Sequence, residues 1–187
     1  NFIDLQRVSL PNGMYNFEML IRDINSEQEA YKFVDIIQID FNSNTIQFSS
    51  IQLIESITPS DNVSALTKNG YDLLPYISNF YPQNFNKISF YTEIYNTNKL
   101  IQGDFMVRYY IESFETYKEF EDYSRFKKLT AAEIIPYIGE INIENLPSGN
   151  YNLVIEVKNR DNISLQKTKF FFQRSNSQQN DLTALNE

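Results

Sequence analysis

Two stretches of the chain share one pattern: Ser9-Leu10-Pro11-Asn12-Gly13-Met14-Tyr15-Asn16 recurs as Asn145-Leu146-Pro147-Ser148-Gly149-Asn150-Tyr151-Asn152. Proline presets the backbone for a turn, and glycine adopts conformations that other residues resist. A tyrosine just after such a turn suits a tyrosine corner, in which the ring enters the core and the hydroxyl bonds to nearby backbone. An ordinary hairpin turn with a core tyrosine is the alternative. Two copies in one chain favour structural tyrosine corners at Tyr15 and Tyr151.

Each copy leads into a strand in which apolar and polar side chains alternate. The apolar positions are Tyr15, Phe17, Met19 and Ile21 after the first copy, and Tyr151, Leu153, Ile155 and Val157 after the second. Alternation with a period of two marks a strand with one buried and one solvated face. A polar turn and a further strand follow each time. This arrangement predicts an all-β protein with an immunoglobulin- or fibronectin III-like β-sandwich, preceded by the last strands of a similar sandwich.

The chain between the two copies is long enough for one complete sandwich. The predicted strands lie within residues 45–55, 87–95, 105–111, 134–143 and 164–173. A break in the alternation near residue 50 indicates a bulge or a strand that changes sheet. Residues 58–86 contain three prolines and predict a long connection with one strand near 71–74. Aromatic or apolar residues recur every third position over 115–129, which predicts a short strand near 125–127 with an irregular approach.

These strands predict three parts along the chain. Residues 1–44 are expected to be the C-terminal strands of a first, incomplete sandwich, and residues 45–175 a complete one. Residues 176–187 are rich in Ser, Gln and Asn and predict a linker or loose tail. Two or three strands cannot bury a face by themselves. We therefore expect the first part to pack on upstream strands, on the second domain or on a partner.

Composition excludes several classes of function. The formal net charge is −8 and the isoelectric point is near 4.6, which disfavours nucleic acid and anionic membrane surfaces as partners. The chain has neither Cys nor His, which removes thiolate nucleophiles, disulfides, histidine bases and most zinc, copper or haem ligation. No apolar run approaches the roughly 20 residues of a membrane span. The sequence predicts no cofactor.

Four stretches resemble the N-terminal region of the GWxTD domain-containing proteins: residues 71–76, 81–96, 146–153 and 171–176. The resemblance covers about residues 45 to 176, and it implies an exported protein of the Gram-negative cell envelope, in the periplasm or at the outer membrane. The Gly-Trp-x-Thr-Asp motif that names the family is absent, and the chain contains no Trp. The activity of the namesake domain is therefore not transferred to this chain. Other envelope proteins are the partners that the resemblance implies.

Three tyrosines are candidates for an interaction surface. Tyr91 and Tyr95 alternate with core positions on one predicted strand, and Tyr110 does the same on another. If the two strands are neighbours, these rings form an outward aromatic patch suited to a protein partner or to stacking on a sugar. In the conservative interpretation, other parts of the molecule, such as residues 58–86, cover both sheet faces.

Catalysis would have to rest on groups other than His and Cys. A glycosidase needs two carboxylates about 5–10 Å apart, and Glu93 and Glu112 are the candidates if their strands are neighbours. A solvated sheet face beside Lys87 and Arg108 explains them more simply. Residues 119–122 could supply oxygen ligands to calcium, but they lack EF-hand spacing. We therefore predict a non-catalytic structural or protein-interaction module of the bacterial envelope, with a carbohydrate-binding module as the alternative.

Overall fold

A computed structural model of the chain describes residue 6, residues 8–62 and residues 64–177. The chain divides into two compact units, Asn1–Asn42 and Ser43–Glu187. Each unit is described by itself. Of the predicted tail, residues 178–187 lie outside the described residues.

The described residues of the first unit form one antiparallel hairpin. It consists of β1 (Gly13–Ile21) and β2 (Tyr31–Ile39), which pair along their full length from Gly13 opposite Ile39 to Ile21 opposite Tyr31. Its connecting loop contains a turn in which the Ser26 amide donates to the Asp23 carbonyl oxygen at 3.3 Å. The alternation seen in the sequence therefore produces two distinct hairpin faces.

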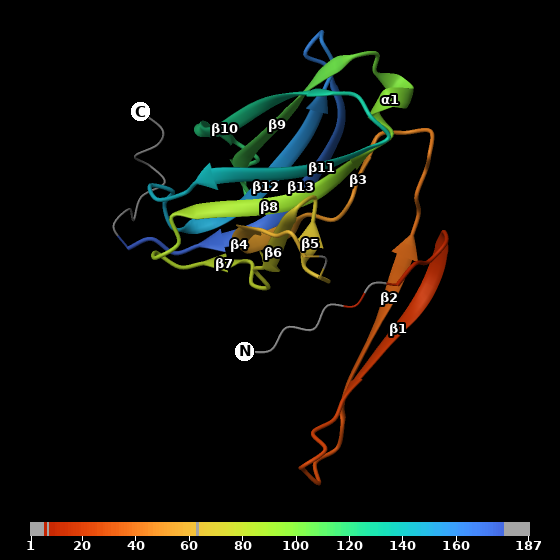
Figure 1. The fold of residues 1–187 in the computed structure, drawn as a ribbon. Coiled ribbons are helices and arrows are strands. Elements are labelled where there is room, and N and C mark those ends of the chain that lie inside the picture. Colours follow the sequence, from red (N-terminus) through yellow and green to blue (C-terminus); the bar gives the residue numbers. More distant parts are fainter. Residues whose placement is uncertain (1–5, 7, 63, 178–187) are drawn as a thin grey trace. The chain divides into compact units, whose positions relative to one another are not determined.

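The second unit has two stacked sheets (Figure 1). The five-stranded sheet contains, in spatial order, β10 (Glu119–Thr130), β9 (Asp104–Ser113), β12 (Gly149–Lys158), β13 (Ser164–Arg174) and β7 (Phe80–Tyr81). The six-stranded sheet contains β11 (Ile134–Asn142), β8 (Lys87–Tyr95), β4 (Gln52–Pro59), β6 (Tyr71–Pro75) and β5 (Thr67–Lys68), with β3 (Gln47–Phe48) also paired to β8. A short helix, α1 (Thr97–Leu100), follows β8. The pairing of β13 with β7 is parallel.

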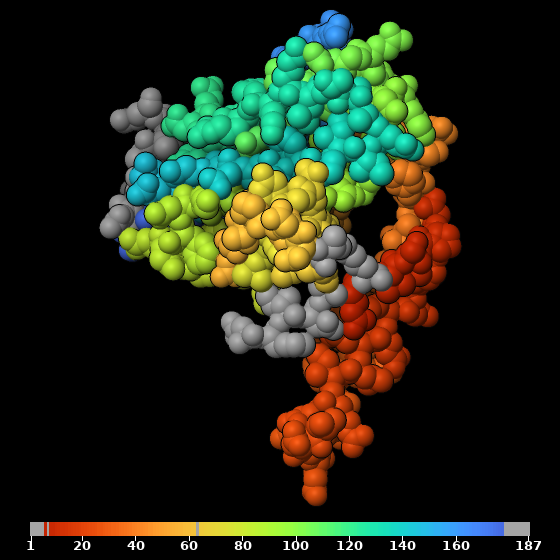
Figure 2. All heavy atoms as spheres, viewed as in Figure 1, coloured from red at the N-terminus to blue at the C-terminus, as the bar shows by residue number. Residues whose placement is uncertain are grey.

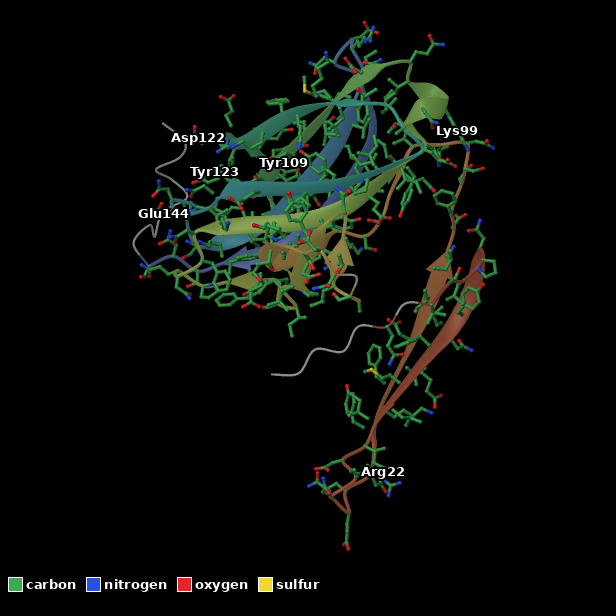
Figure 3. The ribbon with its side chains drawn as sticks, in the orientation of Figure 1. Arg22, Lys99, Tyr109, Asp122, Tyr123 and Glu144 are labelled. Atoms are coloured by element: carbon green, nitrogen blue, oxygen red, sulfur yellow. The ribbon has the colours of Figure 1, made fainter. Side chains whose placement is uncertain are left out.

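The core lies between these sheets and draws on both. Fully buried side chains include Ile88, Phe90 and Ile94 from β8, Val107 and Ile111 from β9, and Leu153, Ile155 and Val157 from β12. The Tyr109 ring, labelled in Figure 3, packs at centroid distances of 5.3 Å from Phe90 and 5.9 Å from Tyr137. The predicted all-β sandwich is confirmed; its immunoglobulin- or fibronectin III-like subclass stays a prediction.

Two predicted segments differ from the structure. The predicted short strand near 125–127 is part of β10, whose pairing with β9 shifts register between Glu119 and Ser124. This irregularity explains why the apolar spacing fits neither a clean strand nor a helix. The predicted long connection, residues 58–86, contains β5, β6 and β7 among its described residues, where the sequence predicts one strand. Its β5–β6 hairpin turns at Asn69 and Gly70, whose φ angles of 50° and 79° are those that a two-residue hairpin loop needs.

Both tyrosine corners form the hydrogen bond that the motif predicts. The Tyr151 hydroxyl donates to the Pro147 carbonyl oxygen at 3.0 Å, and the Tyr15 hydroxyl donates to that of Pro11 at 2.8 Å. The ring of Tyr151 is buried in the core, whereas that of Tyr15 is only half-buried. The tyrosine-corner hydrogen bond thus forms in both copies, although only the tyrosine of the second copy is fully buried.

The repeat also holds a second, non-local contact. Asn12, one residue after the first corner proline, exchanges two hydrogen bonds of 2.9 Å with the backbone of Phe41, two residues beyond β2. Ser148 in the second corner bonds in the same way to the backbone of Asn176, two residues beyond β13, at 2.8 and 3.2 Å. The β1–β2 and β12–β13 hairpins are therefore equivalent structural units.

Asn176 corrects the predicted start of the tail. Its side chain is buried and donates to the carbonyl oxygens of Glu144 and Leu146 at 2.8 and 3.1 Å. Because its backbone also bonds to Ser148, the residue belongs to the sandwich and not to a linker.

Candidate interaction surface

The β1–β2 hairpin has one face that is almost entirely apolar, here called the apolar face. It consists of Tyr15, Phe17, Met19, Ile21, Tyr31, Phe33, Asp35 and Ile37. Phe17 and Phe33 pack edge to face at 6.4 Å, yet they are 42% and 40% exposed. Asp35 is the one charged side chain among them. Large apolar groups left in water on this scale mark a surface that another element covers.

The opposite face of the hairpin, here called the mixed face, has a different character. It consists of Met14, Asn16, Glu18, Leu20, Lys32, Val34, Ile36 and Gln38. Glu18 and Lys32 form an exposed ion pair at 2.9 Å across the strands. An exposed ion pair keeps its hydration, and burying it would cost the desolvation free energy of both charges. The two faces are therefore suited to a covered side and a solvated side, respectively.

The second unit shows what covers the equivalent apolar face. In β12, the counterparts of Tyr15, Phe17, Met19 and Ile21 are Tyr151, Leu153, Ile155 and Val157, all of which are fully buried. The six-stranded sheet lies over them, and β9 pairs with the edge of β12 from Tyr151 to Lys158. Within the described residues of the first unit, no strand corresponds to β9 and no sheet to the six-stranded one.

Energetics indicate that the hairpin needs such a cover. A single two-stranded hairpin is marginally stable in water, because independent stability needs further strands or another element packed on its apolar face. Covering one large apolar side chain contributes about 1.5–3 kcal/mol. Several such side chains, including Phe17, Phe33 and Met19, are available on the apolar face. The arrangement can therefore bind a β-sheet layer or an added strand.

The predicted tyrosine patch does not form. Tyr91 and Tyr95 lie on β8 in the six-stranded sheet, whereas Tyr110 lies on β9 in the other sheet. Each points to the predicted outer side of its own strand, but Tyr91 is 4% and Tyr110 is 2% exposed. The patch required β8 and β9 to be neighbours, and they are not. Alternation in the sequence shows on which side of a strand a residue lies, but it does not show which strands pair.

Residues from the long connection cover Tyr91, as the conservative interpretation held. Tyr91 packs with Ile54 and Leu73, and the ammonium group of Lys68 lies 4.3 Å from its ring centroid. The surface that β5 and β6 contribute is yellow in Figure 2. The hydroxyls of Tyr91 and Tyr95 both donate to the carboxylate of Glu93, the first at 2.6 Å.

Tyr110 is covered by charge pairing on the other sheet. The Arg108 guanidinium lies 4.1 Å from its ring centroid and binds the carboxylate of Glu119. Burial alone would raise the pKa of Glu119, but the hydrogen bond and the charge of Arg108 hold that pKa below its ordinary value. The buried Glu156 lies near Arg108 at 3.7 Å and Lys167 at 3.3 Å. These groups form a structural ion-pair network.

The candidate carboxylate pair is separated in the same way. Glu93 belongs to β8 and Glu112 to β9, in different sheets, so they do not form a two-carboxylate site. Glu112 accepts hydrogen bonds from Lys169 at 2.5 Å and Asn152 at 3.1 Å. Both carboxylates thus have structural partners.

Two further properties concern the described part of the chain. Among those residues, no cluster of three or more acidic side chains could hold a metal ion, so residues 119–122 do not assemble into one. No helix in the described part of the chain is long and apolar enough to cross a membrane; α1 has four residues. Neither protein-family models nor curated proteins show a match to the chain.

Sequence reasoning found the apolar face indirectly. The alternation in β1 and the repeat both indicate an apolar face, whereas the predicted interaction surface consists of tyrosines whose strands do not pair. The signal that distinguishes the apolar face from the tyrosines is that the first copy of the repeat has no further strands among the described residues of its unit. A hairpin without its sandwich exposes an apolar side that patterning predicts to be buried.

Proposed function

We propose that this chain is a non-catalytic structural and protein-interaction module of a larger assembly in the bacterial cell envelope. The observation that carries the proposal is the apolar face of the β1–β2 hairpin, because the residues of β12 that correspond to the apolar residues of β1 are fully buried. Strand addition is the binding mode that fits it, because main-chain pairing along a free edge supplies affinity and alternate side chains supply specificity. The envelope location rests on the resemblance to the GWxTD domain-containing proteins.

The three predicted tyrosines give no support to the carbohydrate-binding alternative. A stacking platform needs exposed and coplanar rings, and Tyr91 and Tyr110 are buried on separate sheets. The apolar face of the hairpin carries Phe, Met and Ile with few hydrogen-bonding groups. Such a surface suits a protein strand or sheet better than a hydroxyl-rich sugar.

Site-specific photocrosslinking in the envelope fraction of the source bacterium tests the proposal. A photoreactive residue replaces Phe33 on the apolar face, and Val34 on the mixed face is the matched control. We expect a discrete crosslinked product from position 33 and little from position 34, with protein at the crosslinked site. Equal labelling from both positions, or a glycan at the crosslinked site, would contradict the proposal.

A further inference from the structure

One edge of the five-stranded sheet, along β13, is largely without a paired strand and lies beside a groove; β3 approaches β13 but pairs with β8 instead. β7 pairs with β13 only through Phe80 and Tyr81, opposite Gln173 and Arg174. In the ranges that the structure describes, no strand pairs with residues 164–172 on the side away from β12. A strand edge of this length presents unpaired backbone groups and is a template for another strand.

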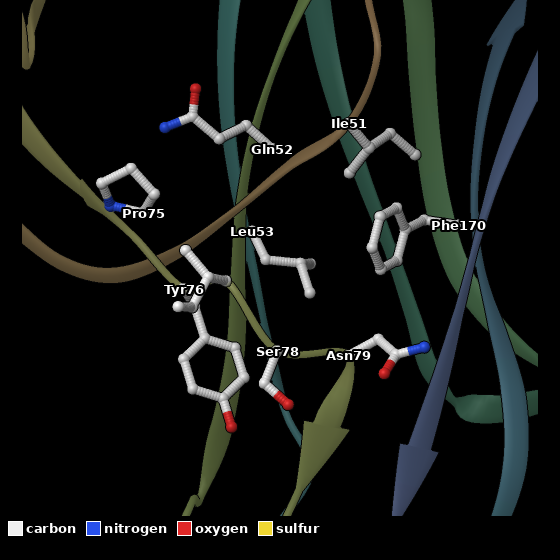
Figure 4. Close-up of a pocket in the computed structure, with 9 residues that line it drawn as sticks. Ile51, Gln52, Leu53, Pro75, Tyr76, Ser78, Asn79 and Phe170 are labelled. Carbon is white, nitrogen blue, oxygen red and sulfur yellow. The ribbon is translucent and has the colours of Figure 1, made fainter. Parts of the chain in front are cut away.

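The groove lies where this edge faces the six-stranded sheet. It has a volume of about 640 Å³, and Ile51, Leu53 and Phe170 form its apolar floor. Figure 4 shows the side chains of Ile51, Leu53 and Phe170 facing a common space. Gln52 and Asn79 also line the groove. An extended chain along β13 would place alternate side chains into this groove, because successive residues of a strand point to opposite sides.

Exposed apolar groups flank the opening. Ile77 lines the groove and is 86% exposed, and Phe80 at the start of β7 is 44% exposed. At the other end of the open edge, Leu165 is also exposed. The Asn79 carbonyl oxygen accepts the Gln173 amide at 2.8 Å, so an added strand would continue a pairing that the chain itself begins.

Charge on β13 identifies the kind of strand that fits. Lys167 and Lys169 alternate with the inward-facing Thr168 and keep 44% of their side chains exposed while paired to Glu156 and Glu112. Opposite charges on directly opposed strand residues are favourable and like charges unfavourable. A second copy of β13 paired antiparallel about Thr168 would set lysine against lysine, so the chain itself is a poor occupant.

We propose that the open edge of β13 binds an extended segment of a partner protein as an added strand, with alternate apolar residues in the groove and acidic residues opposite Lys167 and Lys169. This site is separate from the β1–β2 hairpin. The partner segment is recognised by its alternating apolar residues and by the acidic residues at its outward-facing positions. The inference does not rest on the hairpin being covered.

Selection of a random dodecapeptide library on the full chain tests this inference. We expect enriched peptides to alternate apolar and acidic residues. The best peptide should slow amide hydrogen exchange within residues 164–172. The variant Ile77→Ser should weaken its binding at least tenfold, whereas Ile163→Ser, an equally conservative change at an exposed isoleucine in the β12–β13 turn, should not. Replacing the acidic residues of the peptide by lysine should also weaken binding at least tenfold.

Other outcomes would overturn it. The inference fails if no peptide is enriched, if the peptide slows hydrogen exchange outside β13, or if Ile77→Ser and Ile163→Ser weaken binding equally. It also fails if hydrogen exchange in β13 slows with rising protein concentration in the absence of peptide, because a second copy of the chain would then occupy the edge. The double variant Phe17→Ser, Phe33→Ser separates this site from the proposed function, because it removes the apolar face and should leave peptide binding unchanged.

Discussion

The hydroxyl of Tyr151 donates a 3.0 Å hydrogen bond to the carbonyl oxygen of Pro147, four residues earlier, inside a fully buried corner of the sandwich. The same bond joins Tyr15 to Pro11, but there the surroundings are open. One local device thus occurs with and without its core. The pair offers an internal comparison of what burial adds to a hydrogen bond.

Tyr151→Phe should lower the free energy of unfolding of the second unit by about 1–2 kcal/mol, because the Pro147 carbonyl oxygen loses its partner in a buried site. The matched change Tyr15→Phe should leave that unfolding transition unchanged. Urea denaturation followed by tyrosine fluorescence measures both, since the chain contains no Trp. Equal destabilisation by Tyr151→Phe and Tyr15→Phe would contradict the idea that burial of the second corner makes its hydrogen bond the more stabilising one.

Gly139→Ala should destabilise the sandwich by about 1–3 kcal/mol, as expected for overpacking a core. A Cβ atom at Gly139 would lie 2.2 Å from the ring of Phe90, which is opposite it in the β11–β8 pair and fully buried. Phe90→Leu should offset part of the cost in the double variant. Thermal unfolding of both single variants and the double variant gives the coupling energy, and strict additivity would rule out this contact as the cause.

Tyr81→Phe should raise the free energy of unfolding by about 1 kcal/mol. The Tyr81 hydroxyl is buried and has no hydrogen-bond partner among the residues that the structure describes, and an unsatisfied buried polar group is destabilising. The ring should keep its packing against Tyr76 at 4.9 Å and Phe172 at 5.7 Å. Tyr76→Phe is the control and should act in the opposite direction, because its hydroxyl donates to the Phe80 carbonyl oxygen.

Arg108→Gln should raise the pKa of Glu119. In the folded protein, burial opposes ionisation of Glu119, but the hydrogen bond and the charge of Arg108 outweigh it and hold the pKa of Glu119 below its ordinary value. A lowered pKa in the folded state contributes stability above the ordinary pKa of the carboxyl, and this contribution is lost as pH falls through the folded value. Carbon NMR titration of the Glu119 carboxyl measures the shift.

Glu115 is the internal control for that titration. Its pKa is also lowered, but chiefly by the hydrogen bond from the Asn150 side chain. Arg108→Gln should therefore leave the Glu115 midpoint where it is. If both carboxyls move together, the cause is a general change of charge and not the specific pair of Arg108 with Glu119.

The alternating strands and the corners could be predicted because both are local. Leu153, Ile155 and Val157 repeat with the period of a half-buried strand, and the Pro-x-Gly-x-Tyr spacing is complete within a few residues. The β5–β6 hairpin was missed although its Asn-Gly turn is a strong local signal. In β10, the register shift before Ser124 removed the period that would have revealed its full length.

The candidate site depends on which strands meet, and that is a non-local property. The pattern of residues is enough to predict that Tyr91 and Tyr110 face away from the core residues beside them, because side-chain direction alternates along each strand. That these two tyrosines lie in different sheets, covered by Lys68 and Arg108, follows from the three-dimensional arrangement of the strands. Strand pairing brings together residues far apart in the chain, and several pairings satisfy the same alternation. The apolar face of the hairpin follows from local alternation and can be predicted from the sequence. The edge of β13 and its groove depend on how the two sheets are placed and cannot be predicted from it.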